Sequence, residues 1–505
     1  MKKHIQKIFL QLAFVVSLGL LAAGRTSAQT FSNLHSFTAP DDTYATNSDG
    51  AEPIASLILS GNILYGTGNQ GGMGANGTVF KVSRNGSGFG ILHTFSASSG
   101  ANLTNSDGAN PQAGLILSGS TLYGAAADGG TNGSGTLFRV NTDGTGFTNL
   151  HTFNFSDSGG AVPGNMILSG NTLYGAASDG GSNGSGALFS ININGAGFTN
   201  IYSFTATSSS TPYTNGDGAY PASLILSSNT LFGTANSGGG SGNGTVFRLN
   251  TDGTGFTNLY SFTAGNNNSN YYLSYTNNDG TRPVAVVLSG NTMYGVAEYG
   301  GPNGCGTLFA LNTDGSSFTN LHTFAAFAEN SANYLTNLDG FQPVGIFLSG
   351  NTLYGATEYG GPNGSGTVFA LNTDGGHFTL IHGFTAPSDS LPTTNSDGKW
   401  PVGGVILSGS TLYGTALEGG SSGYGTVFSL TLPSPPPLTI NRSAANVVLS
   451  WPTNDAALTF TLQTTPNLTA SAVWTNVSPS LVVINGLNIV SNSISGTQRF
   501  YRLNQ

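Results

Sequence analysis

The chain is built around one short motif that occurs seven times. The tripeptide Leu-Tyr-Gly, or a close variant, recurs every 51 to 62 residues, with its aromatic residue at Tyr65, Tyr123, Tyr174, Phe232, Tyr294, Tyr354 and Tyr413. Self-similarity at such a period is typical of proteins in which each copy is one supersecondary unit that packs against its neighbours. We therefore expect a repeat architecture for most of the chain.

Copy six shows the unit most clearly. Four segments follow one another, at Ile346–Leu348, Thr352–Gly355, Gly366–Phe369 and Phe378–His382, and Ser-Gly-Asn and Asn-Thr-Asp-Gly join them in pairs. Asn, Asp and Gly tolerate the positive φ of tight hairpin turns, so successive segments are expected to form antiparallel strands. The first segment is a continuous apolar triplet, which predicts an innermost strand buried on both faces.

Composition supports an all-β chain. Gly fills 76 of 505 positions and charged residues only 7%, which disfavours long helices, while 30 Phe and 19 Tyr supply apolar area for a core. Seven four-stranded units predict a β-propeller rather than a solenoid, because the ends complement each other. The segment 31–37 is an unpaired fourth strand, and copy seven stops after its third strand at 425–428. We expect a seven-bladed β-propeller over residues 29–432, closed by the N-terminal strand.

The segments outside the repeats have their own signatures. Residues 1–28 combine Lys2, Lys3 and Lys7 with an apolar run and small residues, which is typical of a secretory signal peptide. Residues 433–439 read as a Pro-rich linker, and residues 440–505 as a small C-terminal β-sandwich, either a sorting or attachment module or a passive domain. We expect an exported protein, located outside the cell, at its surface or in the periplasm.

Charge excludes one class of partner. Removal of residues 1–28 takes away four basic residues and no acidic one, which leaves nine basic against 22 acidic residues. Nucleic-acid binding needs clustered Lys and Arg, so no nucleic-acid partner is expected. The single cysteine, Cys305, cannot form an internal disulfide, and no apolar run after residue 28 is long enough to predict a transmembrane helix.

The repeated cassette resembles a known family. The segments Leu-Ile-Leu-Ser-Gly-Asn-Thr-Leu-Tyr-Gly, Gly-Gly-x-Asn-Gly-x-Gly-Thr-Val-Phe and Leu-Asn-Thr-Asp-Gly are similar to the Gloeobacter/Verrucomicrobia tandem-repeat family of exported proteins, and more distantly to kelch and quinoprotein propellers. The resemblance implies a secreted repeat protein with a C-terminal sorting module. It implies no catalytic residue and no cofactor.

Formal catalytic patterns lack their structural context. Residues 66–71 match a dinucleotide-binding pattern, and residues 180–184 and 419–423 match a nucleophile elbow. Both motifs require a strand-to-helix turn, and no helix is expected here. We predict no catalytic residue and favour a non-enzymatic protein.

Two recurring polar positions carry residue types that could ligate a metal. His35, His93, His151, His322 and His382 share one position of the fourth strand, and Tyr202 and Tyr260 replace them in two copies, which favours packing or hydrogen bonding over ligation. The loop to the next copy carries Asp beside Gly in six copies, with Pro four residues later. These aspartates are interpreted as turn caps, with a cation contact as the weaker alternative: Asp49, Asp107, Asp217, Asp279, Asp339 and Asp397.

The variable loops predict where binding occurs. The crossovers into copies five and six are among the longest, and Glu-Tyr pairs stand in the Gly-Gly loops of the same copies. Tyrosines beside polar groups can stack on a sugar while bonding its hydroxyls, although they can equally pack on their own blade. The candidate ligand-binding residues are Tyr271, Tyr272, Tyr275, Glu298, Tyr299, Tyr334, Glu358 and Tyr359. Three functions stay open: a propeller that binds a polysaccharide or cell-surface component, a structural or adhesive surface protein, and a polysaccharide-active enzyme.

Overall fold

The computed structural model describes residues 29–100, 103–156, 158–267, 275–329, 334–388, 391–433, 437–443, 445–453, 461–466, 474–477, 481–484, 486–493 and 498–504. The expected signal peptide lies outside these residues. Every regular element in the described ranges is a β-strand, so none of their segments is a helix that could cross a membrane. The chain divides into two compact units, one over Phe31–Leu430 and one that holds the C-terminal strands.

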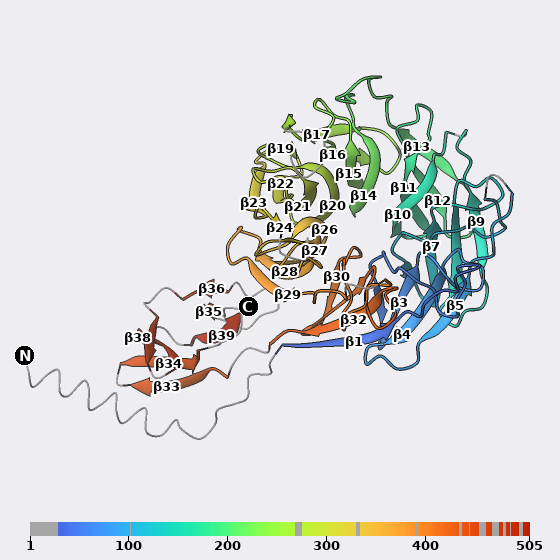
Figure 1. Cartoon of the computed structure of the whole chain (residues 1–505). Helices are drawn as coiled ribbons and strands as arrows, with labels where there is room; N and C mark the ends of the chain where they lie inside the picture. The colour runs from blue at the N-terminus through green and yellow to red at the C-terminus, as the bar shows by residue number, and fades with distance from the viewer. Residues whose placement is uncertain are drawn as a thin grey trace, which may run out of the picture. The chain divides into compact units, whose positions relative to one another are not determined.

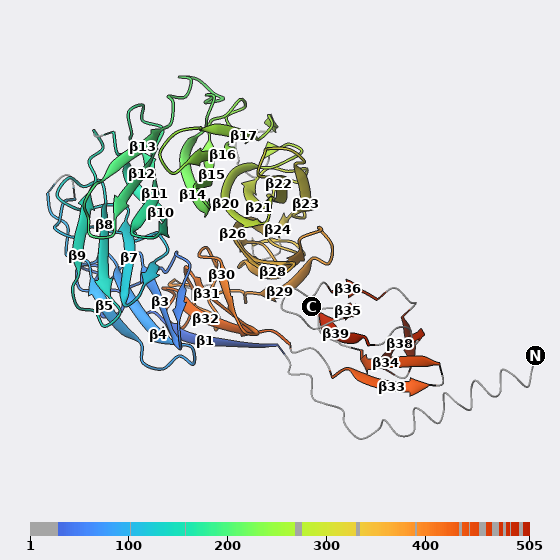
Figure 2. The same cartoon turned by 180° about the vertical axis from the view of Figure 1, so that it is seen from behind.

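The first unit consists of four-stranded sheets that follow the sequence repeat. Within the described residues there are seven of them, arranged one after another around a common centre (Figures 1 and 2). The first three sheets are β2 (Ile58–Ser60), β3 (Ile63–Gly68), β4 (Thr78–Ser83) and β5 (Gly90–Thr94); β6 (Ile116–Ser118), β7 (Thr121–Ala126), β8 (Thr136–Asn141) and β9 (Thr148–Thr152); and β10 (Ala161–Ser169), β11 (Thr172–Asp179), β12 (Ala187–Asn192) and β13 (Thr199–Ser203).

The remaining four sheets have the same strand order. They are β14 (Ala219–Ser227), β15 (Thr230–Ser237), β16 (Thr245–Asn250) and β17 (Thr257–Ser261); β20 (Thr281–Ser289), β21 (Thr292–Tyr299), β22 (Thr307–Asn312) and β23 (Thr319–Thr323); β26 (Phe341–Ser349), β27 (Thr352–Tyr359), β28 (Thr367–Asn372) and β29 (Thr379–Gly383); and β30 (Val405–Ser408), β31 (Thr411–Ala416) and β32 (Thr426–Thr431) with β1 (Thr30–Ser36). Two short hairpins lie in the crossovers into copies five and six: β18 (Asn266–Asn267) with β19 (Tyr275–Thr276), and β24 (Ala328–Glu329) with β25 (Leu335–Thr336). The prediction of an all-β chain with four antiparallel strands per copy is confirmed.

The core lies between adjacent sheets. One cluster joins Tyr65 and Val79 of the first sheet to Leu115, Leu122 and Phe138 of the second, and a related cluster joins the first sheet to the last. The Gly of the repeated tripeptide makes room for this packing. A Cβ on Gly66 would lie 2.6 Å from Cζ of Phe80, the residue opposite it on β4. The motif is therefore a packing requirement rather than a functional signature.

The expectation for the apolar triplet was wrong in one respect. Leu57 is buried, but the residues that follow it, Ile58 and Leu59, are only half-buried, whereas Val79 and Phe80 on the third strand are completely buried. The reason is topological. β2 is the edge strand at one end of its sheet, so one side of it is not covered by another strand.

Neighbouring repeats are joined by one recurring contact, which we call the inter-repeat latch. The residue before the repeat proline donates its backbone N–H to a carbonyl in the loop of the preceding repeat, at 2.9 Å from Asn110 to Asn76, for example. The other latches run from Val162 to Ser134, Tyr220 to Ser185, Arg282 to Asn243, Gln342 to Cys305, Trp400 to Ser365 and Glu52 to Tyr424. The last of these joins the first repeat to the seventh.

Strand β1 extends the sheet that begins with β30. Phe37 donates its N–H to the carbonyl of Gly425 at 3.1 Å, and the side chain of Phe31 packs against Phe428 with ring centroids 5.4 Å apart. The N-terminal segment therefore supplies the outer strand that copy seven lacks.

The described residues of the C-terminal unit form two sheets. One has the order β33 (Thr439–Ser443), β34 (Asn446–Pro452), β38 (Leu487–Ser493) and β37 (Val482–Ile484); the other has β36 (Thr475–Asn476), β35 (Thr461–Thr465) and β39 (Phe500–Asn504). Leu449, Trp451 and Val490 of the first sheet share a buried cluster with Leu462 of the second. Two sheets around one core are the arrangement of a small β-sandwich.

Candidate functional site

Each repeated aspartate lies in a crossover loop and contacts the outer strand that precedes it along the chain. In copy two, Asp107 Oδ2 lies 3.0 Å from His93 Nε2, and the carboxylate also accepts hydrogen bonds from the backbone N–H and the hydroxyl of Ser96. The same contact joins His35 to Asp49 at 3.0 Å, His322 to Asp339 at 2.9 Å and His382 to Asp397 at 2.9 Å. Where Tyr replaces His, its hydroxyl binds the carboxylate, from Tyr202 to Asp217 at 2.7 Å and from Tyr260 to Asp279 at 2.6 Å.

Stacking explains why this position is aromatic. The His93 ring lies against Phe147 with centroids 3.5 Å apart, and the Tyr202 ring lies against Phe256 in the same way at 4.1 Å. His and Tyr both have a flat ring that can stack on the Phe and a polar atom at its tip that can form a hydrogen bond with the Asp. This geometry agrees with the interpretation of the His and Tyr position as a packing and hydrogen-bonding site.

The turn cap is a different residue from the one expected. Asn105, two residues before Asp107, donates through Nδ2 to the carbonyl of Gly108 at 2.7 Å and accepts through Oδ1 from the N–H groups of Gly108 and Gly130. Burial alone would raise the pKa of Asp107, but the hydrogen bonds from His93 and Ser96 hold it below its usual value. Among the residues that the structure describes, no group of three His, Cys, Asp or Glu side chains is placed to hold a metal ion.

The predicted Glu-Tyr pair of copy five lies beside a basic residue on the neighbouring strand. Thr281 pairs with Tyr299 and Pro283 with Ala297, so Arg282 comes between them, opposite Glu298. Arg282 Nε lies 3.1 Å from Glu298 Oε2, and its guanidinium lies over the Tyr299 ring, 5.7 Å from the centroid. Burial raises the pKa of the Glu298 carboxyl despite this partner.

The pair of copy six has an aromatic environment. The Tyr359 ring stacks on Phe341 with centroids 5.6 Å apart and meets Trp400 of the next copy at 5.3 Å. Lys399 lies 3.9 Å from the centroid of the Trp400 ring and 2.9 Å from a carboxylate oxygen of Glu418. Burial, and secondarily the nearby Glu298 charge, raise the pKa of Glu358. The two Glu-Tyr pairs thus stand at the end of the same strand in consecutive repeats. We call these pairs and their neighbours the rim cluster, which consists of Arg282, Glu298, Tyr299, Phe341, Glu358, Tyr359, Lys399, Trp400 and Glu418.

The remaining predicted residues belong to the crossover loops. The Tyr275 hydroxyl accepts hydrogen bonds from the N–H of Gly265 at 2.8 Å and from Asn243 Nδ2 at 2.6 Å, so Tyr275 is tied into its own hairpin. Tyr334 is half-buried beside Gly364. Tyr271 and Tyr272 lie outside the described residues.

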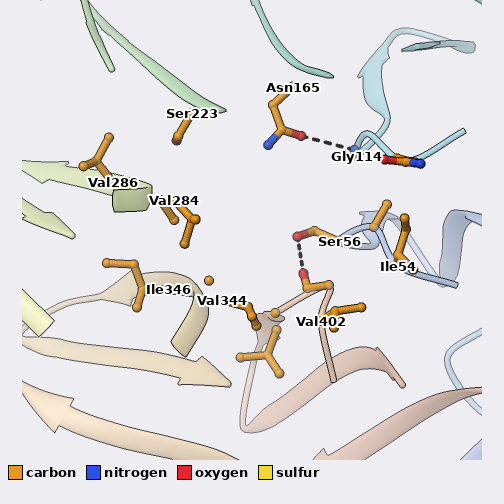
Figure 3. A pocket seen from close by; sticks show the side chains of 17 residues that line it. Ile54, Ser56, Gly114, Asn165, Ser223, Val284, Val286, Val344, Ile346 and Val402 are labelled. Atoms are coloured by element: carbon orange, nitrogen blue, oxygen red, sulfur yellow. Dashed lines mark hydrogen bonds between the residues drawn. The ribbon is translucent and has the colours of Figure 1, made fainter. Parts of the chain in front are cut away.

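A cavity at the centre of the sheets was not predicted from the sequence. Its volume is about 230 Å³, and it is lined by residues that lie within, or just before, the first strand of each of the seven copies. Its polar side chains come only from copies one to four: Ser56, Gln112, Asn165 and Ser223. Copies five to seven supply Val, Ile, Ala and Gly alone. Figure 3 shows Val284, Ile346, Val344 and Val402 along one side, and Asn165, whose Oδ1 accepts from the N–H of Gly114 at 3.4 Å, on another.

The sequence did contain a signal for this site. When the copies are aligned on the repeat proline, the residue before it differs in every copy, although the residues around it are repeated. Tyr220 holds this position in copy four, with an exposed fraction of 41%. A residue that differs in every copy gives no repeated pattern, so the position could not be predicted from the motif alone.

Comparison with known proteins identifies the repeat. The model of the Gloeobacter/Verrucomicrobia repeat matches residues 100–281 and 215–394, which together span more than half of the chain. The chain belongs to this family. The prediction made from the repeated cassette is therefore confirmed, and no curated protein matches the chain at a significant level.

Several solved structures are remotely similar to this member of the family. The oligogalacturonate lyase of Vibrio parahaemolyticus is 10% identical, with a TM-score of 0.46, over 82% of this chain and 99% of its own. A puromycin-hydrolysing peptidase of Mycobacterium tuberculosis is 11% identical, with a TM-score of 0.45, over 84% of this chain and 63% of its own. YCF48 of Cyanidioschyzon merolae is 12% identical, with a TM-score of 0.44, over 80% and 98%. At this distance no activity is transferred to the repeat protein described here.

Proposed function

We propose that the repeat unit is a seven-bladed propeller closed by β1 and that it binds a glycan or another surface polymer without transforming it. Closure is supported by the latch from Glu52 to Tyr424, which has the same donor and acceptor positions as the six latches between consecutive copies. It is also supported by the hydrogen bond from the Thr415 hydroxyl to the carbonyl of Ala55 at 3.1 Å. A closed ring gives the rigid scaffold on which recognition loops are usually presented.

The rim cluster is the observation that carries the binding proposal. Aromatic rings and carboxylates are gathered there on three consecutive copies, while the corresponding positions of copies one to four hold no aromatic residue apart from Tyr220. Aromatic faces stack on the apolar side of a sugar ring, and carboxylate and amide groups bond its hydroxyls. The buried Phe341 ring supports the Tyr359 ring, which in turn contacts Trp400. The half-buried rings of Tyr359 and Trp400 are therefore held in place and lose little entropy when a ligand binds.

A glycan-array screen of residues 29–505, followed by electrophoresis through polysaccharide gels, tests the proposal. Retention should fall for Tyr299→Ala and Tyr359→Ala, by an amount on the order of 1 kcal/mol for each aromatic contact. Tyr44→Ala is the matched control, because Tyr44 is 75% exposed and lies in the loop of copy one. Equal retention of all variants would place binding elsewhere. The absence of retention across neutral and acidic glycans would favour the structural or adhesive alternative.

A second candidate is a polysaccharide-active enzyme. Burial raises the pKa of the Glu358 carboxyl, and this feature favours an enzyme because a raised carboxyl pKa is typical of a general acid. The polysaccharides retained in the gels would be incubated with the protein and assayed for new reducing ends. Release that disappears in Glu358→Gln would support the enzyme, and absence of release from every retained polymer would contradict it.

The remaining parts fit an exported binding protein. Residues 1–28 would direct export, and the C-terminal sandwich would sort the protein or attach it to the cell surface. A fusion of residues 439–505 to a reporter that carries the same signal peptide tests attachment. The reporter should appear in the cell-surface fraction with the sandwich and in the medium without it.

A further inference from the structure

The seven residues before the repeat prolines share an unfavourable backbone conformation. Their φ angles lie between 51° and 60°, and none of them is glycine: Glu52, Asn110, Val162, Tyr220, Arg282, Gln342 and Trp400. We call these residues the mouth ring. For a residue with a Cβ this region costs about 1–2 kcal/mol, and a following proline restricts the backbone further.

Glycine would relieve this cost without breaking the latch, because the latch uses only the backbone N–H. Glycine is abundant throughout the repeats, yet every copy keeps a side chain here, and each side chain is different. A strained position whose side chain is retained but never repeated is better explained by what the side chain presents than by what the fold requires.

The mouth ring and the central cavity are adjacent along the chain. Two residues after Glu52, Arg282, Gln342 and Trp400, the chain reaches the cavity-lining residues Ile54, Val284, Val344 and Val402. The mouth ring therefore lies within two residues of the lining of the cavity in these copies. The mouth ring also contacts the rim cluster, because Arg282 contacts Glu298 and Trp400 contacts Tyr359.

The cavity itself restricts the chemistry of an occupant. None of its lining residues is charged, its polar side chains lie on copies one to four, and the surface that faces the cavity is mostly polar. Its volume is below the ~300–1,000 Å³ of pockets for drug-sized ligands, so it accommodates one small ring. A neutral sugar matches such an uncharged polar lining, because its edge carries hydroxyls that can both donate and accept hydrogen bonds.

We propose that this cavity binds the terminal sugar of a neutral glycan chain and that the mouth ring selects the sugars next to it. The inference rests on the proposed glycan binding and adds that recognition occurs at the chain end. Tyr220 and Trp400 supply aromatic surfaces three copies apart, and so nearly opposite each other in a closed ring of seven.

The test measures affinity against chain length. For a polymer retained in the gels, calorimetric titration uses oligosaccharides of the same linkage, from disaccharide to octasaccharide. If one end enters the cavity, Kd per mole of chain should stop changing beyond the first few sugars, because each chain offers a single site. Tyr220→Ala should weaken binding by about tenfold, which corresponds to 1.4 kcal/mol. Tyr213→Ala is the control, because Tyr213 is 53% exposed in a loop of the same copy.

Filling the cavity provides a second arm. Ser223→Leu adds apolar volume at the cavity wall and should abolish binding of every oligosaccharide while leaving Tm unchanged. If this variant binds as the wild type does, and affinity increases steadily with chain length, the polymer lies across the rim and the chain-end site is wrong, while the proposed function stands. If the wild type binds no glycan, both proposals fail. Should Ser223→Leu lower Tm, the length dependence of the wild type decides.

Discussion

Phe31 of the N-terminal strand stacks on His382 of copy six, with ring centroids 4.6 Å apart and planes inclined by 17°. The same stacking recurs between consecutive copies, for example from Phe89 to His35 at 3.6 Å and from Phe378 to His322 at 4.0 Å. Phe31 therefore takes, for the last sheet, the position that a fourth strand of copy seven would have supplied.

Removal of this strand should destabilise the whole repeat unit. Deletion of residues 31–38 leaves β32 with an unpaired edge, and an exposed edge strand is a template for aggregation. We expect a lower Tm and oligomers in size-exclusion chromatography with light scattering. The milder variant Phe31→Ala should cost roughly 2–3 kcal/mol, less than a fully buried Phe→Ala, because Phe31 is half-buried. A monomeric deletion variant with the wild-type Tm would rule out the proposed closure.

The His and Asp contact should tolerate tyrosine but not phenylalanine. His93→Tyr keeps both the stacking on Phe147 and a hydroxyl for Asp107, as the native Tyr202 does with Asp217. His93→Phe keeps only the stacking and removes one hydrogen bond from a buried carboxylate, a loss of about 1–3 kcal/mol. Urea unfolding should place His93→Tyr close to the wild type and His93→Phe clearly below it. Equal loss in both variants would mean that shape, and not the hydrogen bond, determines this position.

Chelation should leave stability unchanged. The Asp107 oxygens already accept hydrogen bonds from His93 and from the backbone and hydroxyl of Ser96, which competes with cation binding. We expect the same Tm with and without EDTA, since an ion stabilises a protein only if it binds the folded state selectively. A fall in Tm that calcium restores would instead support the cation alternative for the six aspartates.

Packing between repeats makes a sharp prediction about two glycines with positive φ. A Cβ on Gly77 would lie 2.5 Å from the carbonyl oxygen of Gly68 and 2.6 Å from Cδ of Pro111 in the next copy. On Gly61, with φ of 58°, a Cβ would meet nothing within 4 Å. Gly61→Ala should therefore cost only its backbone strain, about 1–2 kcal/mol, whereas Gly77→Ala should cost several kcal/mol more by displacing the proline. Similar losses in chemical denaturation would mean that the copies are less tightly joined.

Sequence reasoning was most successful where the repeat itself carries the signal. Seven copies of the same alternation and the same turn residues specify four strands, because the physics of hairpin turns is local. It was less successful where the outcome depends on the neighbouring copy. The half-buried state of Ile58 and the cavity beside it arise only when several edge strands meet, and no single copy contains that information.

The candidate site shows the same division. Glu298 and Tyr359 could be selected as unusual within the repeat, but their partners Arg282 and Trp400 stand on a different strand or in a different copy. The Asp107 contact with His93 was missed for a related reason, since Asp beside Gly is a common turn signal, and the register that brings it to the outer strand is not visible in the sequence. The variation at the position before the proline is visible in the sequence. It points to a functional role only once the positive φ of these residues is known, because glycine would be expected there otherwise.

The stability contributed by Glu358 should depend on pH in the sense opposite to that of a salt-bridged carboxylate. Burial raises its pKa in the folded protein above the unfolded value, so the folded state holds this proton more tightly. Below about pH 4 the group is protonated in both states; as pH rises through the folded pKa, the folded state loses stability relative to the unfolded state. Glu358→Gln keeps an acceptor for Tyr359 without the charge, so it should raise Tm at pH 7 and match the wild type at pH near 3. Glu298→Gln should gain less at pH 7, because it also gives up the 3.1 Å contact with Arg282. A Glu358→Gln variant that is less stable than the wild type at pH 7 would show that the carboxylate charge is stabilised by its surroundings.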